Sequence, residues 1–399
     1  MGPILEKNTF YSMIYNFLDG LMERVIPSMS EPLAWLVYVV AGLIMVIVIV
    51  NGVMIMSLLF IWWERRLLGR FHHRIGPNRW GPFGLFQPIA DGIKTLFKED
   101  IVPNEADRWV FNLAPIVVLS PLLVMVAVIP FGQGTYMVDL NVAVLYVVAA
   151  GTVETLGIFM AGWGSGNRYA LFGAMRAIAV LLSYEVPLIL ALLGVIMLAG
   201  SMSLIAIVEA QSLPFLLLQP LGFFIFLTAS IAEMNRAPFD LVEAESEIIA
   251  GFHTEYSGMK FGMLQLPDFL SPVIGAGFIT ALYLKGWVGW GVLPSQGWFL
   301  LKLVLVLFLI VWIRATVPRL RIDQVMAFAW KFLFPLSVIN ILVTAVEVIV
   351  LPQPSLAELW LLVGINFVVA IVGIVVMANL LGHRRFRAAT PIRPSVTVS

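Results

Sequence analysis

Three glutamates of this sequence lie inside long apolar runs, where an ionisable side chain is costly. Glu154 has no basic residue within ten positions on either side, Glu185 lies well inside its run, and Glu347 lies near the end of another. A charged side chain inside a membrane costs a few kcal/mol and by default marks a pathway for ions or protons. Glu154 and Glu185 are therefore predicted to carry protons. The position of Glu347 favours snorkelling toward the nearer interface.

A denser group of acids follows the fifth apolar run. It consists of Glu233, Asp240, Glu243, Glu245, Glu247 and Glu255. Asp240, Glu243 and Glu247 are spaced so that a helix would place all three on one face. Clustered like charges raise each other's pKa, which suits groups that take up and release protons. The alternative is a solvated loop, but the apolar run at 248–252 follows directly and favours acids held against protein.

Two basic clusters also lie between apolar runs. One contains Glu64, Arg65, Arg66, Arg70, Arg74 and Arg79, and the other contains Arg314, Arg319, Arg321, Asp323 and Lys331. Such clusters usually set the topology by contact with anionic headgroups. Their excess over that need predicts pairing with the acidic run or with a docked protein.

The composition excludes several classes of protein. Of 399 residues, 60% are hydrophobic and 12% are charged, and the mean hydropathy is +0.96; soluble domains have about 45–50% apolar and about 25% charged residues. The net charge is zero, which offers no basic surplus for nucleic acid. The absence of cysteine excludes disulfides, thiolate zinc sites and Cys-ligated iron–sulfur clusters. The four histidines lie in polar loops or the tail, which argues against an intramembrane haem, so we expect no redox centre in this chain.

The elements that must position these residues are transmembrane helices. A span needs about 20 mostly apolar residues, and β-barrel strands would alternate over about ten residues, which these runs do not. We therefore predict an all-α polytopic membrane protein with about nine spans, or eight if the Gly-containing run at 272–293 fails. The nine runs are 33–62, 110–131, 140–163, 177–199, 214–233, 272–293, 298–317, 330–351 and 357–381.

Loop charges predict the orientation of this single membrane domain, residues 1–399. Loops on one side, including 64–109, 234–271 and the tail 382–399, hold twenty Lys and Arg residues, and the other side holds four. The positive-inside rule then places those loops in the cytoplasm. Nine crossings leave the N-terminus outside and the C-terminus in the cytoplasm.

Two features flank the first span. No charged residue occurs between Glu31 and Glu64, a length of roughly 48 Å against a membrane core of about 30 Å. Part of this helix is predicted to lean on another protein or to enter a cytoplasmic module. Apolar residues at helical spacing predict amphipathic interfacial helices before it, within 1–32, and after it, following the turn-rich loop 74–82.

Four long motifs give a specific resemblance. They read ERRLLGRFHHRIGPNRWGPFGLFQPIADGIKTLFKE (64–99), AGWGSGNRYALFGAMRAIAVLLSYE (161–185), AEMNRAPFDLVEAESEIIAGFHTEYSGMK (232–260) and WIRATVPRLRIDQVMAFAWK (312–331). In type and order, these stretches resemble the family of H subunits of proton-pumping NADH–quinone oxidoreductase, respiratory complex I.

The resemblance implies a component of a bacterial inner-membrane enzyme that lines the chamber where quinone, its substrate, is reduced. It implies chamber or entrance positions at Glu64, Arg65, Arg66, Asp91, Phe252, His253, Tyr256, Arg314, Arg319, Arg321 and Asp323. The implied proton relay comprises Glu185 and the acidic run Glu233, Asp240, Glu243, Glu245, Glu247 and Glu255, and Glu154 joins it on physical grounds alone. The chain itself binds no cofactor, because FMN and iron–sulfur clusters belong to partner subunits. Those partners are hydrophilic quinone-module subunits on the cytoplasmic side and small membrane subunits alongside, with lipids around them.

Departures and alternatives remain. After Lys260 the family usually has a run ending Glu-Tyr, whereas this chain has Asp268-Phe269 after Pro267, which predicts a different chamber floor. One alternative is the homologous component of a membrane-bound hydrogenase or a ferredoxin-linked complex, in which no quinone need bind. The other is an independent ion-coupled transporter, a class that often shows inverted repeats or paired broken helices, neither of which is evident here.

Overall fold

The computed structural model describes residues 8–25, 34–241, 250–289, 291–352 and 354–388, with side chains placed except at 21–25, 34 and 381–388. Within these residues every named element is a helix, which confirms the predicted all-α class. The elements are α2 (Thr9–Val25), α3 (Ala34–Phe71), η2 (Pro82–Gly84), α4 (Gln87–Phe97), α5 (Arg108–Val126), α6 (Ala143–Gly164), α7 (Arg168–Ala199), α8 (Leu204–Ala210), α9 (Phe215–Leu218), α10 (Pro220–Glu233), η3 (Gly251–His253), α12 (Gly258–Tyr283), α13 (Ser295–Thr316), α14 (Ile322–Phe328), the π-helix η4 (Ala329–Leu333), α15 (Phe334–Val350) and α16 (Leu356–Ala388).

Eight helical segments among the described residues are long and apolar enough to cross a membrane. They comprise α3, α5, α6, α7, α12, α13, the continuous α14–η4–α15 unit and α16. Helices suit this setting because their backbone groups are paired within each segment. The remaining predicted run, 214–233, forms the four-residue α9 and the 14-residue α10, which is about 21 Å long.

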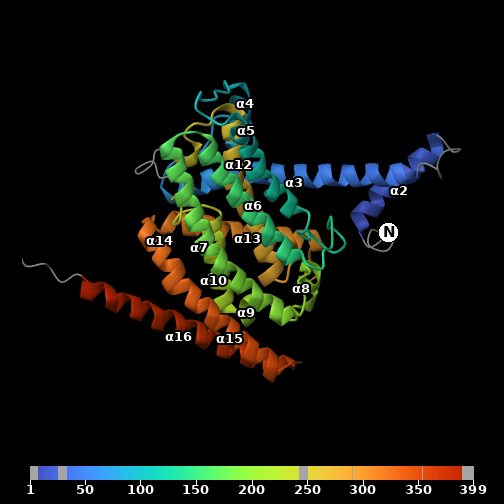
Figure 1. Ribbon diagram of the computed structural model, residues 1–399. Coiled ribbons are helices and arrows are strands. Elements are labelled where there is room, and N and C mark those ends of the chain that lie inside the picture. Colours follow the sequence, from blue (N-terminus) through green and yellow to red (C-terminus); the bar gives the residue numbers. More distant parts are fainter. Residues whose placement is uncertain (1–7, 26–33, 242–249, 290, 353, 389–399) are drawn as a thin grey trace, which may run out of the picture.

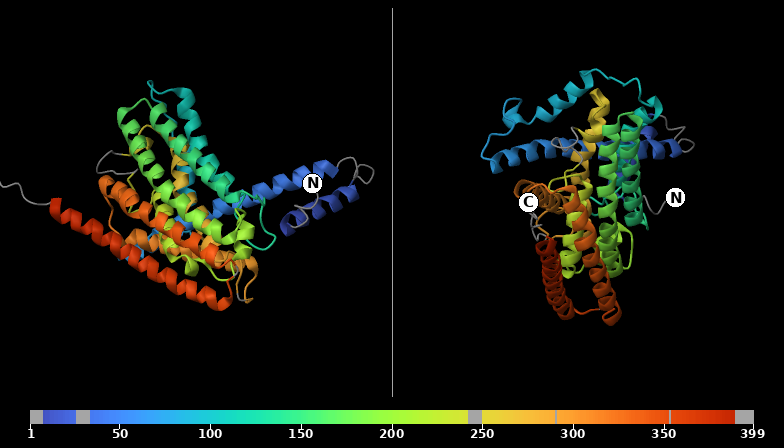
Figure 2. Two further views of the ribbon diagram at one scale, coloured as in Figure 1. Left: turned by 60° about the horizontal axis from the view of Figure 1, so that its bottom comes forward. Right: turned by 60° about the vertical axis from the view of Figure 1, so that its left-hand side comes forward.

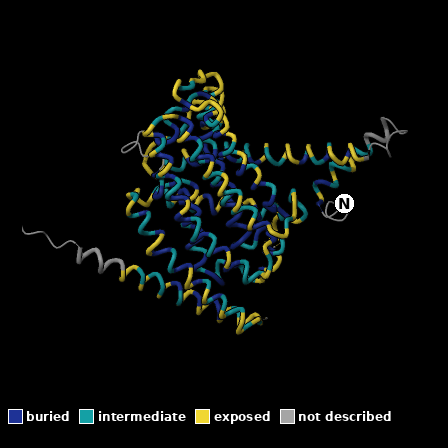
Figure 3. The backbone as a smooth tube through the Cα atoms, in the orientation of Figure 1, coloured by how far each residue is buried: buried dark blue, intermediate teal, exposed yellow. Residues whose placement is uncertain are grey.

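A bundle of helices forms the body of the molecule. Helices α5, α6, α7, α10 and α12 pack together, and α15 lies along α7. Figures 1 and 2 show α16 passing obliquely along one side of this bundle. In Figure 3 the buried backbone lies at the centre of the bundle, whereas α16 is largely exposed or half-buried.

Helices α2 and α3 form an arm that extends from the bundle (Figure 1). Helix α3 has 38 residues, about 57 Å, which confirms the predicted excess length. Its first half packs on α2 through Tyr11, Ala41 and Met45 and leaves many apolar side chains exposed. Two contacts near the start of α2 fasten the arm: the Thr9 N–H donates to the Gly134 carbonyl (3.0 Å), and the Asn8 amide donates to the Tyr136 carbonyl.

The sixth predicted span begins fourteen residues earlier than expected. Helix α12 covers Gly258–Tyr283 instead of 272–293, with Pro267 and Pro272 inside it. The predicted bounds assumed a helix that faces lipid and is therefore apolar throughout. Most of α12 is buried in protein instead, and its polar residues face a cavity. Lys285, at positive φ, lies just beyond its end.

The two interfacial segments are helical as predicted. Helix α4 follows the irregular loop 74–82, and its Ile89, Ile93 and Leu96 are exposed. On α2, Met13 and Phe17 are exposed while Tyr11 is buried against α3. Each helix therefore leaves an apolar face available to the membrane or to another protein.

Candidate functional site

A charged cavity of about 240 Å³ lies where α3, α12 and α13 meet the segment that follows α10. Its described lining is Glu64, Arg65, Leu68, Asn235, Arg236, Asp240, Gln265, Asp268, Phe269 and Arg314. These residues come from three of the four motifs, 64–99, 232–260 and 312–331, and from the run after Lys260 that departs from the family pattern. The cavity thus unites both basic clusters with the start of the acidic run.

A buried carboxylate with two arginines organises this cavity. Glu64 is only 2% exposed, and its Oε1 lies 3.3 Å from Arg236 Nη1 and also pairs with Arg314 Nη1. Burial lowers the pKa of Arg236 from its ordinary value, and the Glu64 carboxylate opposes that shift. The predicted pairing of Arg314 with the acidic loop is therefore replaced, within the described residues, by pairing with Glu64.

Arg236 lines the cavity although the sequence did not predict it as a site residue. Its guanidinium also donates to the Asp268 carbonyl and lies over the Phe269 ring, 5.0 Å from the centroid. The residues that depart from the family motif thus form one wall of the cavity. The only signal for Arg236 was its place as a lone arginine among acids.

The outer part of the first basic cluster makes more exposed contacts. Arg65 Nη1 lies 2.7 Å from Asp91 Oδ2, with both side chains 42% exposed. Arg66 lies over Phe83, 4.7 Å from its centroid, and over Trp62 at 5.6 Å. Arg65 and Asp91 therefore join α3 to α4 beside the charged cavity.

A second cavity, the acid cavity, contains two of the predicted proton carriers. It measures about 80 Å³ and is lined mostly by apolar side chains of α5, α6, α7, α10 and α12, together with Glu154, Glu233, Ser230 and Ser271. A Cβ on Gly151 would lie 3.1 Å from Glu233 Oε1, so the Glu233 carboxylate reaches α6 one turn before Glu154. The two glutamates therefore share one small space.

Glu185 extends this acid group along α7. Its Oε1 accepts a hydrogen bond of 2.9 Å from the Thr152 hydroxyl on α6, and it lies within electrostatic reach of Glu233. Thr152 and Glu233 are both exposed at the surface of the chain. The acid cavity consequently opens toward the side of the bundle.

The two cavities adjoin at the end of α10. Glu233 and Met234 line the acid cavity, and Asn235 and Arg236 line the charged cavity. The chain turns between them at Asn235, whose φ of 51° is a left-handed conformation that asparagine tolerates better than most residues. Asp268 lines the charged cavity and still acts electrostatically on Glu154.

Other predicted site residues lie elsewhere. Phe252, His253 and Tyr256 are buried; Phe252 and Tyr256 pack with α5, α6 and α7, and the Tyr256 ring stacks on Phe111 with 4.0 Å between centroids. Glu255 Oε1 accepts a 2.6 Å hydrogen bond from Asn167. These residues fasten the end of the acidic loop to the bundle.

The remaining predicted positions lie at the surface or outside the described part. Arg319, Arg321 and Asp323 are exposed and line neither cavity. Glu243, Glu245 and Glu247 fall outside the described residues. Among the residues that are described, no cluster of three His, Asp or Glu side chains could hold a metal ion.

Comparison with known proteins places this arrangement in a family. A family model described as NADH dehydrogenase matches residues 43–345. The chain is 57% identical over 328 residues to the H subunit of NADH-quinone oxidoreductase from Dehalococcoides mccartyi (strain CBDB1), covering 82% of this chain and 92% of the relative. The H subunit from Carboxydothermus hydrogenoformans is 49% identical over 72% of this chain and 83% of its own length, and the one from Syntrophotalea carbinolica is 47% identical over 79% and 98%.

The residues that the family model matches include every described residue that lines the two cavities. The cysteine-free sequence fits a component whose enzyme keeps its cofactors in other subunits. The chain therefore belongs to the family of H subunits of NADH-quinone oxidoreductase and is a multi-pass membrane component of that enzyme.

Proposed function

We propose that the charged cavity is the membrane-side part of the chamber in which quinone is reduced, and that the acid cavity couples this reduction to proton movement. The observation that carries the proposal is the junction at residues 233–236, where consecutive side chains line the two cavities. A change of charge in one cavity can therefore act on the other, because the two linings adjoin within four consecutive residues.

The charged cavity suits a quinone headgroup. Arg236 and Arg314 supply N–H donors for its carbonyl oxygens, and Asp240, beside them, is an acid that can exchange protons. Reduction of quinone to quinol adds two electrons and two protons. The electrons come from a partner protein of the complex, and the protons leave groups that line the chamber.

The acid cavity then responds to that proton loss. Glu233 repels both Glu154 and Glu185 when these groups are ionised, so a change of charge on one glutamate acts on its neighbour. Deprotonation near Asp268 and Asp240 favours proton retention on these glutamates, and refilling of the chamber favours release. This exchange links quinone chemistry to proton translocation.

The exposed side of the acid cavity requires a neighbour. Carboxylates facing lipid are costly, and Glu233 is exposed in this chain. A small membrane protein of the complex covers this opening in our proposal and continues the proton path. Hydrophilic subunits cover the opposite cytoplasmic end, where Ile75, Trp80, Phe83 and Phe97 are exposed beside the basic loops.

The proposed orientation follows from the loop charges. Helix α10 begins beside α9 (Figure 1) and ends two residues before the lining of the charged cavity, so it supplies a ninth crossing despite its 14 residues. The N-terminus then lies outside and the C-terminus in the cytoplasm.

Glu185→Gln in the assembled complex tests the coupling role. The amide keeps the size and the Thr152 contact but cannot exchange a proton, so we expect quinone reduction and proton pumping to fall about tenfold. Glu209→Gln, an exposed acid on α8, is the matched control. Wild-type pumping by an assembled Glu185→Gln complex would contradict the relay.

A further inference from the structure

One face of α15 carries a row of polar side chains through the apolar bundle. Ser337, Asn340, Thr344 and Glu347 follow one another at spacings of three, four and three residues, which places them on one side of the helix. The first three are buried, and α15 packs along α7 and α10. The row extends about 15 Å toward the end opposite the charged cavity.

Several polar atoms along this row have no partner among the described residues. The Gln219 Nε2 donates to Thr344 Oγ1 (2.8 Å), but Gln219 Oε1, Asn340 Nδ2 and the Tyr283 hydroxyl are buried and unpaired. Gln219 is 2% exposed and Asn340 is 5% exposed. An unmade hydrogen bond at such a site costs about 1–3 kcal/mol. Because the Gln219 atom accepts and the Asn340 atom donates, one water molecule can satisfy both.

Two glycines let these amides lie close to the helix backbones. A Cβ on Gly194 of α7 would lie 3.0 Å from Gln219 Nε2 and 3.1 Å from Asn340 Nδ2. A Cβ on Gly222 of α10 would also lie 3.1 Å from Asn340 Nδ2. A methyl group at either position would therefore crowd the amide pair.

The row ends at a cavity of about 410 Å³ between the ends of α7 and α15 and the start of α16. Glu347 is its one ionisable side chain among the described lining residues, and Glu347 Oε1 is buried without a partner there. Two charged residues beside the cavity lining contact other groups: Lys285 donates to the carbonyl of Ser212, a lining residue (2.9 Å), and Glu358, next to the lining residue Leu359, accepts from the Ser355 N–H (2.6 Å). Glu347 thus stands between the polar row and this cavity.

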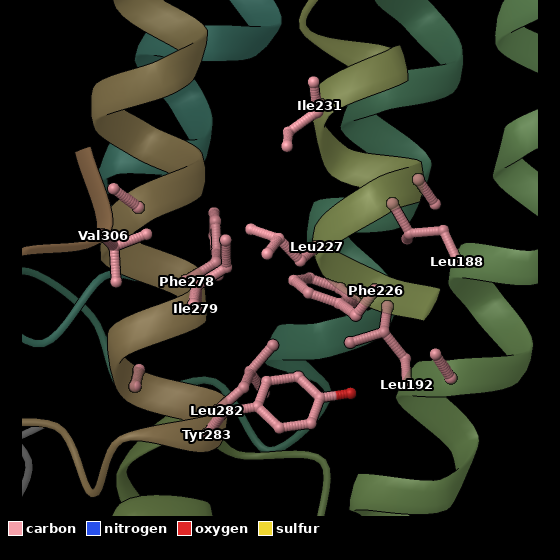
Figure 4. Packing of buried hydrophobic residues seen from close by; sticks show 14 of the residues in the cluster. Leu188, Leu192, Phe226, Leu227, Ile231, Phe278, Ile279, Leu282, Tyr283 and Val306 are labelled. Carbon is pink, nitrogen blue, oxygen red and sulfur yellow. The ribbon is translucent and has the colours of Figure 1, made fainter. Parts of the chain in front are cut away.

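The inner end of the row lies near the acid cavity along α10. Gly222, Phe226, Ser230 and Glu233 share one face of this helix, and Gln219 directly precedes its first residue. Phe226 lines the acid cavity and packs against Tyr283, with 5.5 Å between centroids. In Figure 4 the Tyr283 hydroxyl points toward the helix that carries Leu192. Phe226 is therefore the apolar side chain between the acids and the amide pair.

We propose that this row is hydrated and forms the outer segment of a proton path, with Glu347 as its terminal proton carrier. Glu347 accepts a proton from water held by Gln219 and Asn340 and releases it to water in the outer cavity, so that charge is conserved at each transfer. The segment rests on the proposed function for its supply of protons, which comes from Glu154, Glu185 and Glu233. The sequence alone favoured snorkelling of Glu347 toward the interface. Snorkelling does not explain why buried polar side chains lie behind Glu347 on the same face of α15.

The test uses the whole complex in sealed vesicles. Glu347→Gln is expected to lower the number of protons translocated per quinone reduced by at least about one, while quinone reduction measured with an ionophore stays at the wild-type rate. Glu358→Gln, which changes an exposed acid at the same end, is the matched control and is expected to keep the wild-type ratio.

Gly222→Ala provides a second, independent variant in case Glu347→Gln does not assemble. Its methyl group would lie 3.1 Å from Asn340 Nδ2 and 3.3 Å from Gln219 Oε1 and would displace these amides, so the ratio is expected to fall although no ionisable group is removed. Wild-type ratios in assembled Glu347→Gln or Gly222→Ala complexes would overturn the path. If Glu185→Gln lowers pumping in the same assay while these variants do not, the proposed function stands and the outer path fails. The reverse pattern would retain the outer path and refute the relay at Glu185.

Discussion

Glu64 is almost wholly buried in the charged cavity, where its carboxylate contacts two arginines, Arg236 and Arg314. Glu64→Gln would leave Arg236 and Arg314 close together without an anion. Removal of one partner from a buried ion pair costs about 3–5 kcal/mol, and less where a partner such as Arg314 is partly exposed. We expect a lower unfolding temperature of the complex and weaker quinone binding, measured by thermal denaturation and by the KM for quinone.

Asp91→Asn is the matched control, since the Arg65–Asp91 pair is largely solvated. Its effect on stability is expected to stay below about 1 kcal/mol. Equal effects of the two substitutions would show that burial of the Glu64 cluster has no energetic consequence.

His253 should make stability depend on pH. Burial lowers the pKa of His253 to about 4, below its ordinary value of 6.5, so the unfolded chain binds a proton in this interval that the folded chain does not. The corresponding stability is present above about pH 6.5 and is lost as the pH falls toward 4, by up to about 3 kcal/mol. His253→Phe keeps a ring beside Phe252 and Phe261 and should flatten the unfolding temperature between pH 7 and 5.

His72→Gln, at an exposed histidine, should retain the wild-type pH slope. A variant at position 253 with that same slope would refute the assignment of the effect to this imidazole.

At the scale of elements, the attachment of the acidic loop depends on a contact between backbones. A Cβ on Gly173 of α7 would lie 2.7 Å from Gly251 Cα and 3.0 Å from the Phe252 nitrogen. Gly173→Ala should therefore displace η3 and the end of the loop, at a cost of about 1–3 kcal/mol. Hydrogen exchange of residues 250–256 should increase.

Gly92→Ala is the control for this change, because a Cβ there meets nothing within 4 Å and Gly92 lies in exposed α4. Unchanged exchange at 250–256 in Gly173→Ala would mean that η3 is held by its side chains alone.

Element boundaries could be predicted where helices face lipid and not where they face protein. Hydropathy located α5, α6, α13 and α16 to within several residues, because their apolar faces remain exposed. It misplaced α12, whose Gln265 and Asp268 line the charged cavity instead of marking a loop. Two prolines, Pro267 and Pro272, lie inside α12, where the surrounding helices tolerate them.

The site was predictable in part for a similar reason. Glu154 and Glu185 stood out because each interrupts an apolar run, and the structure brings both near Glu233. The pairing of Glu64 with Arg236 was not predictable, because 172 positions separate them and their contact depends on the packing of α3 against α12. The roles of Phe252, His253 and Tyr256 depended equally on tertiary packing, which local sequence does not contain.

At the scale of the whole molecule, the chain is expected to carry no redox centre. It has no cysteine, and its described part holds no metal-binding cluster of acids and histidines. The purified chain, freed of its partner proteins in detergent, should show no flavin, haem or iron by absorbance spectroscopy and metal analysis. Stoichiometric iron or a visible absorption band in that preparation would contradict this prediction, and the intact complex serves as the positive control.

The arm formed by α2 and α3 has a consequence for how the protein is made. These helices are synthesised before the bundle, and their tethers at Gly134 and Tyr136 emerge from the ribosome only after α5. During that interval the exposed apolar length of α3, including Trp35, Leu43 and Ile47, is free of the bundle. A neighbouring protein of the complex that recognises this surface can therefore bind the nascent chain before the bundle exists, so assembly of the complex can begin at the arm.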